Sequence, residues 1–175
     1  MDIRTRLLET AEQLFERHGF TATGMDRLTS AAGISSRTLY KHVGNKNGLI
    51  VAVMNERDRR FHRLMKTDSI DALFTTLQTW FTQEGARGCL SLRAWGETGG
   101  GVPEIAEAME RHKQRLRERI DAIVLAEIGR HDTELAEAIQ LLFEGAIHAA
   151  TYRGGDAAQA ARRTAHRLAD LARAA

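Results

Sequence analysis

The segment from Thr23 to Lys46 constrains the fold of this chain more than any other stretch of its sequence. Apolar residues recur there at the spacing of one helical face, at Met25, Leu28, Ala31 and Ala32. Gly33 follows directly, and glycine adopts the positive φ of a tight turn without steric cost. Ser35 suits the cap of a second helix, because its hydroxyl accepts a backbone N–H. The pattern predicts two short helices joined by a turn, with Leu39 and Val43 facing inward on the second.

The outer face of the second predicted helix is polar and basic. It carries Ser36, Arg37, Tyr40 and Lys41, with His42 near its end. Hydroxyl donors, a guanidinium and a phenol on a two-turn helix suit a DNA major groove. The sequence has no Asp or Glu between Asp26 and Glu56, whereas four basic residues fall in that window. Phosphate binding favours such a surface. The alternative is a plain helical hairpin with a solvated basic face.

An ordered set of residues extends on both sides of this turn. It comprises Leu14-Phe15, Gly19-Phe20, Thr23, Ala31-Ala32-Gly33-Ile34-Ser35, Thr38-Leu39-Tyr40, and Lys46 followed by Leu49. In this set the region from Phe15 to Leu49 resembles the DNA-binding region of the tetracycline-repressor (TetR) family of transcriptional regulators. Three positions depart from the family pattern: Thr29 replaces a usual Ala, Val43 a usual Phe and His42 a frequent Tyr. These changes affect packing around the second helix and leave the arrangement intact.

The resemblance implies an all-α, nine-helix TetR-like architecture. Residues 1–46 would form a three-helix DNA-binding domain with the helix-turn-helix, 47–66 a connecting helix, and 67–175 a helical ligand-binding and dimerisation domain. In the family, a lysine at the position of Lys46 contacts the DNA backbone. Thr23 is expected to cap its helix and to reach a phosphate. The expected DNA-binding residues are Thr23, Ser35, Ser36, Arg37, Thr38, Tyr40, Lys41, His42 and Lys46.

Composition agrees with a helical globular protein of 175 residues. The chain has 43% hydrophobic and 27% charged residues, a single proline and a single cysteine. One cysteine excludes a disulfide framework and suits the cytoplasm. The sequence shows neither a signal peptide nor an apolar stretch long enough to span a membrane, so we expect no membrane association. Residues 1–66 carry a net charge of +5 and the remainder −3, which favours a polyanion partner for the first part only.

Beyond residue 66 the pattern predicts further helices and no catalytic motif. The three glycines at 99–101 have neither a preceding strand nor a Gly-Lys-Ser motif, so we interpret them as a connector rather than a phosphate loop. No Glu lies three residues before a His, which argues against a di-iron site. The chain has no Gly-x-Ser-x-Gly elbow and no two-histidine zinc motif. We therefore expect no enzyme activity, no metal and no cofactor.

The last two predicted helices are rich in small and apolar residues. The helix from about Thr133 to Tyr152 is apolar around much of its circumference, and the one from about Ala157 to Ala174 is rich in alanine. This favours a two-fold dimer through a four-helix bundle, whereas burial within one monomer is the alternative. TetR-like proteins dimerise through their last two helices. The expected interface residues are Ile139, Leu142, Phe143, Ala146, Ala149, Ala150, Leu168 and Leu171.

TetR-like regulators also commonly carry a ligand pocket in the helical body. The candidate lining here is Phe74, Trp80, Cys89, Leu92, Trp95, Met109, His112, Phe143, His148 and Tyr152, and each of these also suits a core position. Arg87-Gly88-Cys89 with Glu97 resembles a subset of the family, and a thiolate stabilised by Arg87 would make Cys89 a sensor. A buried structural thiol is the alternative. The sequence thus predicts a dimeric repressor that a small-molecule effector releases from a palindromic double-stranded DNA operator. A helical protein-binding module is the remaining alternative.

Overall fold

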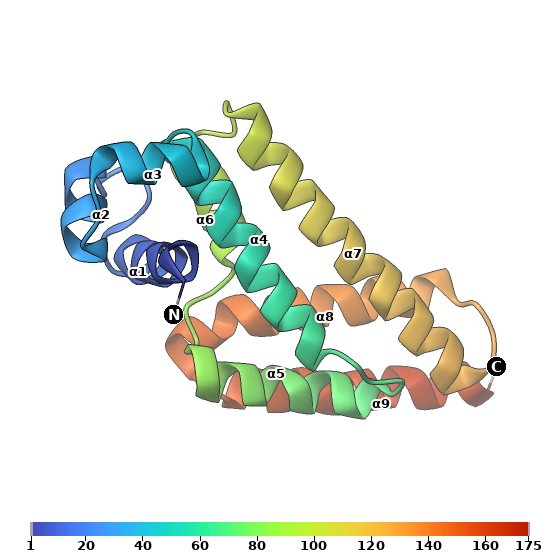
Figure 1. Cartoon of the computed structure of the whole chain (residues 1–175). Helices are drawn as coiled ribbons and strands as arrows, with labels where there is room; N and C mark the ends of the chain where they lie inside the picture. The colour runs from blue at the N-terminus through green and yellow to red at the C-terminus, as the bar shows by residue number, and fades with distance from the viewer. Residues whose placement is uncertain (1, 175) are drawn as a thin grey trace. The chain divides into compact units, whose positions relative to one another are not determined.

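The computed structural model describes residues 2–174, and within them the chain forms nine α-helices and no strand (Figure 1). This confirms the predicted all-α architecture. The helices are α1 (Ile3–His18), α2 (Met25–Ala32), α3 (Ser36–Val43), α4 (Lys46–Leu64), α5 (Ile70–Glu84), α6 (Leu90–Glu97), α7 (Pro103–Ile128), α8 (Thr133–Arg153) and α9 (Asp156–Ala174).

The helices form two compact units that are discontinuous in sequence. The first unit runs to Arg60 and includes Leu90–His112, and the second comprises Phe61–Cys89 and the chain from Lys113 onward. Helices α4 and α7 therefore contribute residues to both units. The domains expected from the sequence were contiguous. The difference arises because α6 and the first half of α7 contribute apolar side chains to the core of the N-terminal helices.

The core of the first unit is built on the apolar stripe of α1. Leu7 and Phe15 are fully buried, and Phe15 stacks on Phe20 with ring centroids 4.8 Å apart. The same cluster takes in buried residues of five further helices: Leu28, Leu39, Leu49, Leu90, Ala94 and Ile105. These contacts place the two short helices α2 and α3 on a common apolar base.

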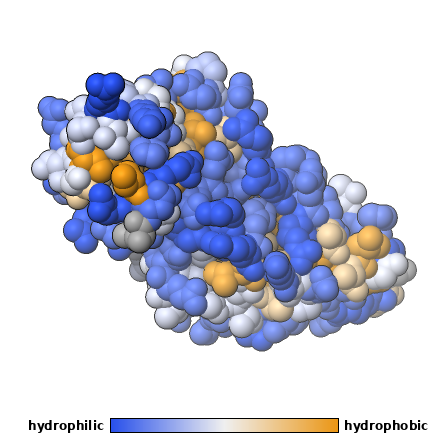
Figure 2. All heavy atoms as spheres, viewed as in Figure 1, coloured by the Kyte–Doolittle hydropathy of each residue, from blue (hydrophilic) through white to orange (hydrophobic). Residues whose placement is uncertain are grey.

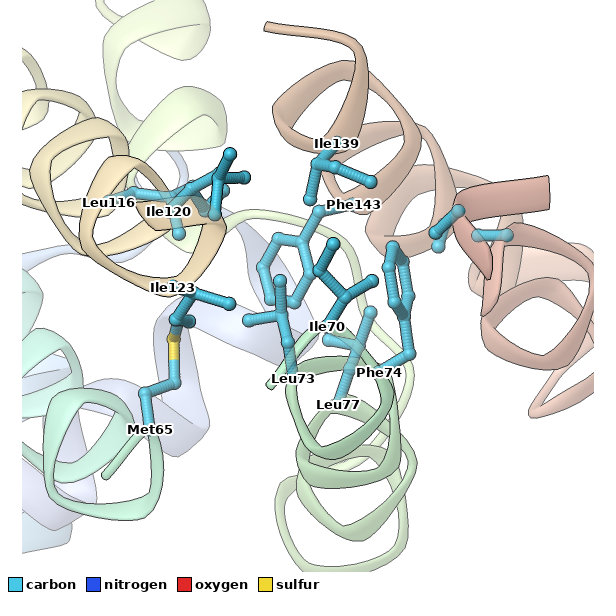
Figure 3. Packing of buried hydrophobic residues seen from close by; sticks show 14 of the residues in the cluster. Met65, Ile70, Leu73, Phe74, Leu77, Leu116, Ile120, Ile123, Ile139 and Phe143 are labelled. Atoms are coloured by element: carbon cyan, nitrogen blue, oxygen red, sulfur yellow. The ribbon is translucent and has the colours of Figure 1, made fainter. Parts of the chain in front are cut away.

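The core of the second unit is aromatic at its centre (Figure 3). Phe143 of α8 packs against Phe74 of α5 and Phe61 of α4, with centroid distances of 5.9 and 6.0 Å. Helix α9 contributes alanines to this core at four buried positions, Ala158, Ala161, Ala165 and Ala169. Small side chains allow helices to approach closely, and α9 packs against both α5 and α8 (Figure 1).

The surface drawn in Figure 2 is mostly hydrophilic, with apolar residues in small groups. Among the described residues, no helix is both long and apolar enough to cross a lipid bilayer.

Candidate nucleic-acid interface

The turn between α2 and α3 has the geometry that the sequence predicts. Gly33 adopts the left-handed conformation, with φ 63° and ψ 41°, and its N–H donates to the last carbonyls of α2. The hydroxyl oxygen of Ser35 then accepts a 3.1 Å hydrogen bond from the N–H of Thr38, which caps α3. Glycine and serine thus fix the angle at which α3 leaves α2.

Helix α3 buries one residue and presents most of the others to solvent. Leu39 is fully buried, whereas Ser36, Arg37 and Lys41 are exposed and Tyr40 is 49% exposed. The hydroxyl of Thr38 is hydrogen-bonded to that of Ser35 at 2.9 Å. The exposed side chains offer a guanidinium, an ammonium and two hydroxyl groups, which are the groups that read base edges and phosphates in a major groove.

His42 is half-buried, unlike the exposed residues of α3. It lines a groove of about 510 Å³ together with residues of α1 and α4, among them Arg4 and Arg59. The half-buried His42 therefore lies at the margin of the exposed surface of α3.

Lys46 is the first residue of α4 and its ammonium group is held in place. Its Nζ donates a 3.0 Å hydrogen bond to the carbonyl oxygen of Thr21. Partial burial lowers the pKa of Lys46 from its usual value, and the nearby Glu97 carboxylate acts in the opposite direction. A cation at the N-terminus of a helix adds to the positive dipole there, so this position favours an anion.

Gly48 allows the chain to turn tightly from α3 into α4. The Asn45 side-chain oxygen accepts the N–H of Gly48 at 2.7 Å, and a Cβ at position 48 would lie 2.1 Å from the carbonyl oxygen of Val43. Any larger residue at 48 would have to displace backbone. Gly48 thereby helps to fix the position of Lys46 beside α3.

Thr23 differs from its predicted role. Its side chain is fully buried and its hydroxyl donates a 2.6 Å hydrogen bond to the carbonyl of Gly19. The N-cap of α2 is Gly24, which has no side-chain cap. The prediction that Thr23 caps α2 is therefore wrong, because its buried hydroxyl is bound to Gly19 instead. Thr23 instead stabilises the loop between α1 and α2.

The structure adds Arg27 to the basic side of this unit. Arg27 on α2 is exposed and its guanidinium contacts His18 Nε2 at 2.8 Å. Sequence reasoning counted this charge but did not assign it to the interface. It also missed Glu97, whose carboxylate accepts N–H groups of the loop between α1 and α2. No spacing in the sequence links Glu97 to that loop 76 residues earlier.

Comparison with known proteins supports this interpretation of the helix-turn-helix. Residues 7–53 match the family model described as bacterial regulatory proteins, tetR family. The fold as a whole matches a TetR-family transcriptional regulator from Streptomyces coelicolor, with a TM-score of 0.83 over 98% of this chain and 96% of that one, at 21% identity. Residues 7–53 therefore belong to a TetR-family DNA-binding region, and the fold as a whole is that of TetR-family regulators.

Two curated members of the TetR family are similar to parts of this chain. The transcriptional repressor NemR of Escherichia coli (strain K12) is 26% identical over 121 residues, which span 63% of this chain and 61% of NemR. The transcriptional repressor ComR of the same strain is 40% identical over 58 residues, or 33% of this chain and 28% of ComR. The matched region thus spans less than two thirds of either relative. Both relatives are named as transcription repressors and not as enzymes.

The residues that the TetR resemblance suggested for an effector pocket are divided between the two units. Leu92, Trp95, Met109 and His112 belong to the first unit, and Phe74, Trp80, Cys89, Phe143, His148 and Tyr152 to the second. Cys89 and Trp80 are buried, Phe74 and Phe143 are fully buried core residues, and Leu92 and Met109 are half-buried.

Of these residues, two are exposed to solvent and two contact neighbouring residues of the chain. Tyr152 is 79% exposed and His148 is also exposed, so neither lies in the interior of this chain. The ring of Trp95 covers Gly100, where a Cβ would lie 3.0 Å from it. His112 forms a hydrogen bond through Nδ1 to the buried carboxylate of Asp58.

The predicted dimer residues of the last two helices also separate into two groups. Ile139, Phe143, Ala146 and Ala150 are buried in the core of the chain itself. Leu142, Ala149 and Leu168 are half-buried, and Leu171 is 69% exposed. Apolar periodicity identified the buried face of α8, which packs against its own chain, rather than the opposite one.

Proposed function

We propose that this chain is a sequence-specific, DNA-binding transcriptional regulator that acts as a homodimer. The observation that carries the proposal is the open face of α3, with Ser36, Arg37, Tyr40 and Lys41 exposed and Lys46 beside it at the start of α4. A helix of this size with these donors fits the major groove, and the flanking cation suits the adjacent phosphate.

We assign different roles to the residues of this surface. Arg37, Tyr40 and Lys41 read base edges and neighbouring phosphates, because they lie on the exposed side of α3. Ser36, Thr38, His42 and Lys46 mainly fix the orientation of the protein on the duplex. Ser35 contributes through the cap that it provides to α3.

We propose that the dimer forms through the outward faces of α8 and α9. Leu141 and Tyr152 on α8 are 74% and 79% exposed, and Leu171 on α9 is 69% exposed. Large apolar side chains exposed together on two helices are typical of an interaction surface. Regulators of the TetR family bind operator DNA as dimers. The two copies of α3, one from each protomer, then read a palindrome whose half-sites are one or more DNA turns apart.

We further propose that the regulator is a repressor that a small molecule releases from DNA, acting in the cytoplasm. The relatives NemR and ComR, both named as repressors, support the direction of regulation. Release requires that effector and DNA prefer different conformations of the dimer, so binding of each must weaken binding of the other.

Selection of genomic DNA fragments on the purified protein tests this function. The protein is incubated with fragments at two salt concentrations, and the bound DNA is sequenced. The proposal expects a short palindrome to be enriched at both concentrations, with less total DNA retained at the higher one. Enrichment without a common sequence, or no retention of DNA at all, would overturn the proposal in favour of a helical protein-binding module.

A further inference from the structure

The carboxylate of Glu97, the last residue of α6, binds the loop between α1 and α2. Its Oε2 accepts the N–H of Phe20 at 2.6 Å and the N–H of Thr21 at 3.2 Å. Its Oε1 lies 3.4 Å from the guanidinium of Arg93, one turn earlier on α6. The carboxylate thus receives donors from two elements of the same compact unit, which fixes its position.

These loop amides need an acceptor because helix α1 ends before them. The chain leaves α1 through Gly19, whose φ of 85° takes the backbone out of the helical conformation. A Cβ at Gly19 would lie 2.9 Å from Glu97 Oε2, so the carboxylate approaches the backbone as closely as glycine allows. Hydrogen bonds to a charged acceptor are roughly twice as strong as neutral ones.

The same loop holds the cation that we assign to the DNA backbone. The carbonyl of Thr21, whose N–H is bound to Glu97, accepts the 3.0 Å hydrogen bond from Lys46 Nζ. The carbonyl of Gly19 accepts the hydroxyl of Thr23 at 2.6 Å. A continuous series of hydrogen bonds therefore runs from Glu97 through the backbone of Thr21 to the ammonium group of Lys46.

Helix α6 also packs into the apolar core beneath α3, the helix that we propose binds the major groove. Leu90 and Ala94 of α6 are buried in the same apolar cluster as Leu28 of α2 and Leu39 of α3. Apolar packing fixes the distance of α6 from this core but is not directional. The hydrogen bonds of Glu97 add a direction, since they hold only when the end of α6 meets the two amides.

We propose that Glu97 is a positioning residue for DNA binding, which couples the end of α6 to the Lys46 anchor through the loop between α1 and α2. The inference rests on the proposed DNA-binding function. A displacement of α6 that withdraws the carboxylate frees the loop, and Lys46 is then no longer oriented toward the phosphate.

The first test is hydrogen exchange of the loop amides, which requires no DNA. We expect Glu97→Ala to accelerate exchange at Phe20 and Thr21 about tenfold, because each loses an acceptor that is charged. Glu97→Gln retains an acceptor oxygen and should give an intermediate rate. The control is Glu110→Ala, which removes an exposed carboxylate of α7 in the same unit and should leave both rates unchanged. Unchanged protection in Glu97→Ala would overturn the proposal.

The second test measures operator affinity across a salt series with the DNA selected by the wild-type protein. We expect Glu97→Ala to weaken binding about tenfold and to reduce the salt slope by about one per protomer, as one phosphate contact is lost. Glu97→Gln should recover much of the affinity and of the salt slope. Glu110→Ala should resemble the wild type. A general loss of folded protein would lower the active fraction without changing the slope. Unchanged or tighter binding by Glu97→Ala would overturn the inference, whereas absence of specific binding by the wild type would overturn the proposed function instead.

Discussion

Arg57 on α4 donates a 2.6 Å hydrogen bond to Glu12 on α1, and both side chains are only 10% exposed. The same guanidinium donates to Glu16 at 2.9 Å, and Arg60 donates to both oxygens of Glu12 at 2.8 and 3.0 Å. Two positive and two negative groups thus form one network between α1 and α4. The network fixes α4, which begins with Lys46, against the helix that precedes the recognition motif.

Replacement of Glu12 by alanine should destabilise the protein by about 3–5 kcal/mol, because it leaves two guanidinium groups without their shared carboxylate. Urea unfolding followed by circular dichroism measures this change. The matched control is Glu9→Ala on the exposed face of the same helix, with an expected change within about 0.5 kcal/mol. Equal stability of the two variants would contradict a structural role for the network.

From the hydrogen bonds of Asp71 we predict that the stability of the folded protein depends on pH. This carboxylate on α5 accepts hydrogen bonds from His166 Nε2 at 2.6 Å and from Arg162 at 2.6 and 2.8 Å, both on α9. The hydrogen bond from His166 is the main cause that lowers the pKa of Asp71, with further contributions from Arg162. The folded pKa therefore lies below the unfolded one.

The contribution of Asp71 to stability is therefore fully present above an unfolded pKa of about 3.9, and it is lost as the pH falls through the lower folded pKa. We expect Asp71→Asn to be less stable than the wild type at pH 7 by less than about 1 kcal/mol, since the pair is partly exposed. The deficit should shrink as the pH is lowered toward 3. Urea unfolding at pH 7, 5 and 3 measures it, and a deficit that grows with acid would contradict the assignment.

Arg37 and Lys46 should differ in how their loss affects DNA binding. Arg37→Ala should relax or alter the preferred base at one position of each half-site, at a cost of about 1–3 kcal/mol on the best sequence. Lys46→Ala should weaken binding to all sequences and reduce the salt slope by about one per protomer. Repeated selection and titration with each variant separates the two effects. Uniform weakening by both changes would refute this division.

The dimer surface is tested by charge introduction at its exposed apolar residues. Leu141→Glu and Leu171→Glu should each shift the protein toward monomer by at least about tenfold in the dimer dissociation constant, because they place carboxylates between two copies. Sedimentation velocity measures the shift. Leu125→Glu on α7, whose leucine is 37% exposed, is the control and should remain dimeric. Monomer formation by all three variants would indicate general destabilisation.

The sequence predicted those features that arise from local chemistry. Gly33 and Ser35 lie in short-range motifs whose geometry depends on a few neighbouring residues, and both behave as expected. Thr23 was misassigned because a threonine before a helix suits a cap as well as the observed bond to Gly19. On α8, apolar periodicity identifies a buried side without saying which helix covers it, and several of these residues pack within their own chain. Glu97 and Asp58 act through contacts between distant segments, which spacing does not encode.

Equilibrium binding to a single duplex tests the central claim most directly. The wild-type protein is titrated onto a duplex that carries the selected palindrome and onto the same duplex with the palindrome scrambled, at one physiological salt concentration. We predict at least about 1,000-fold tighter binding to the palindrome, with two protomers bound. Equal affinity for the two duplexes would contradict sequence-specific reading by α3.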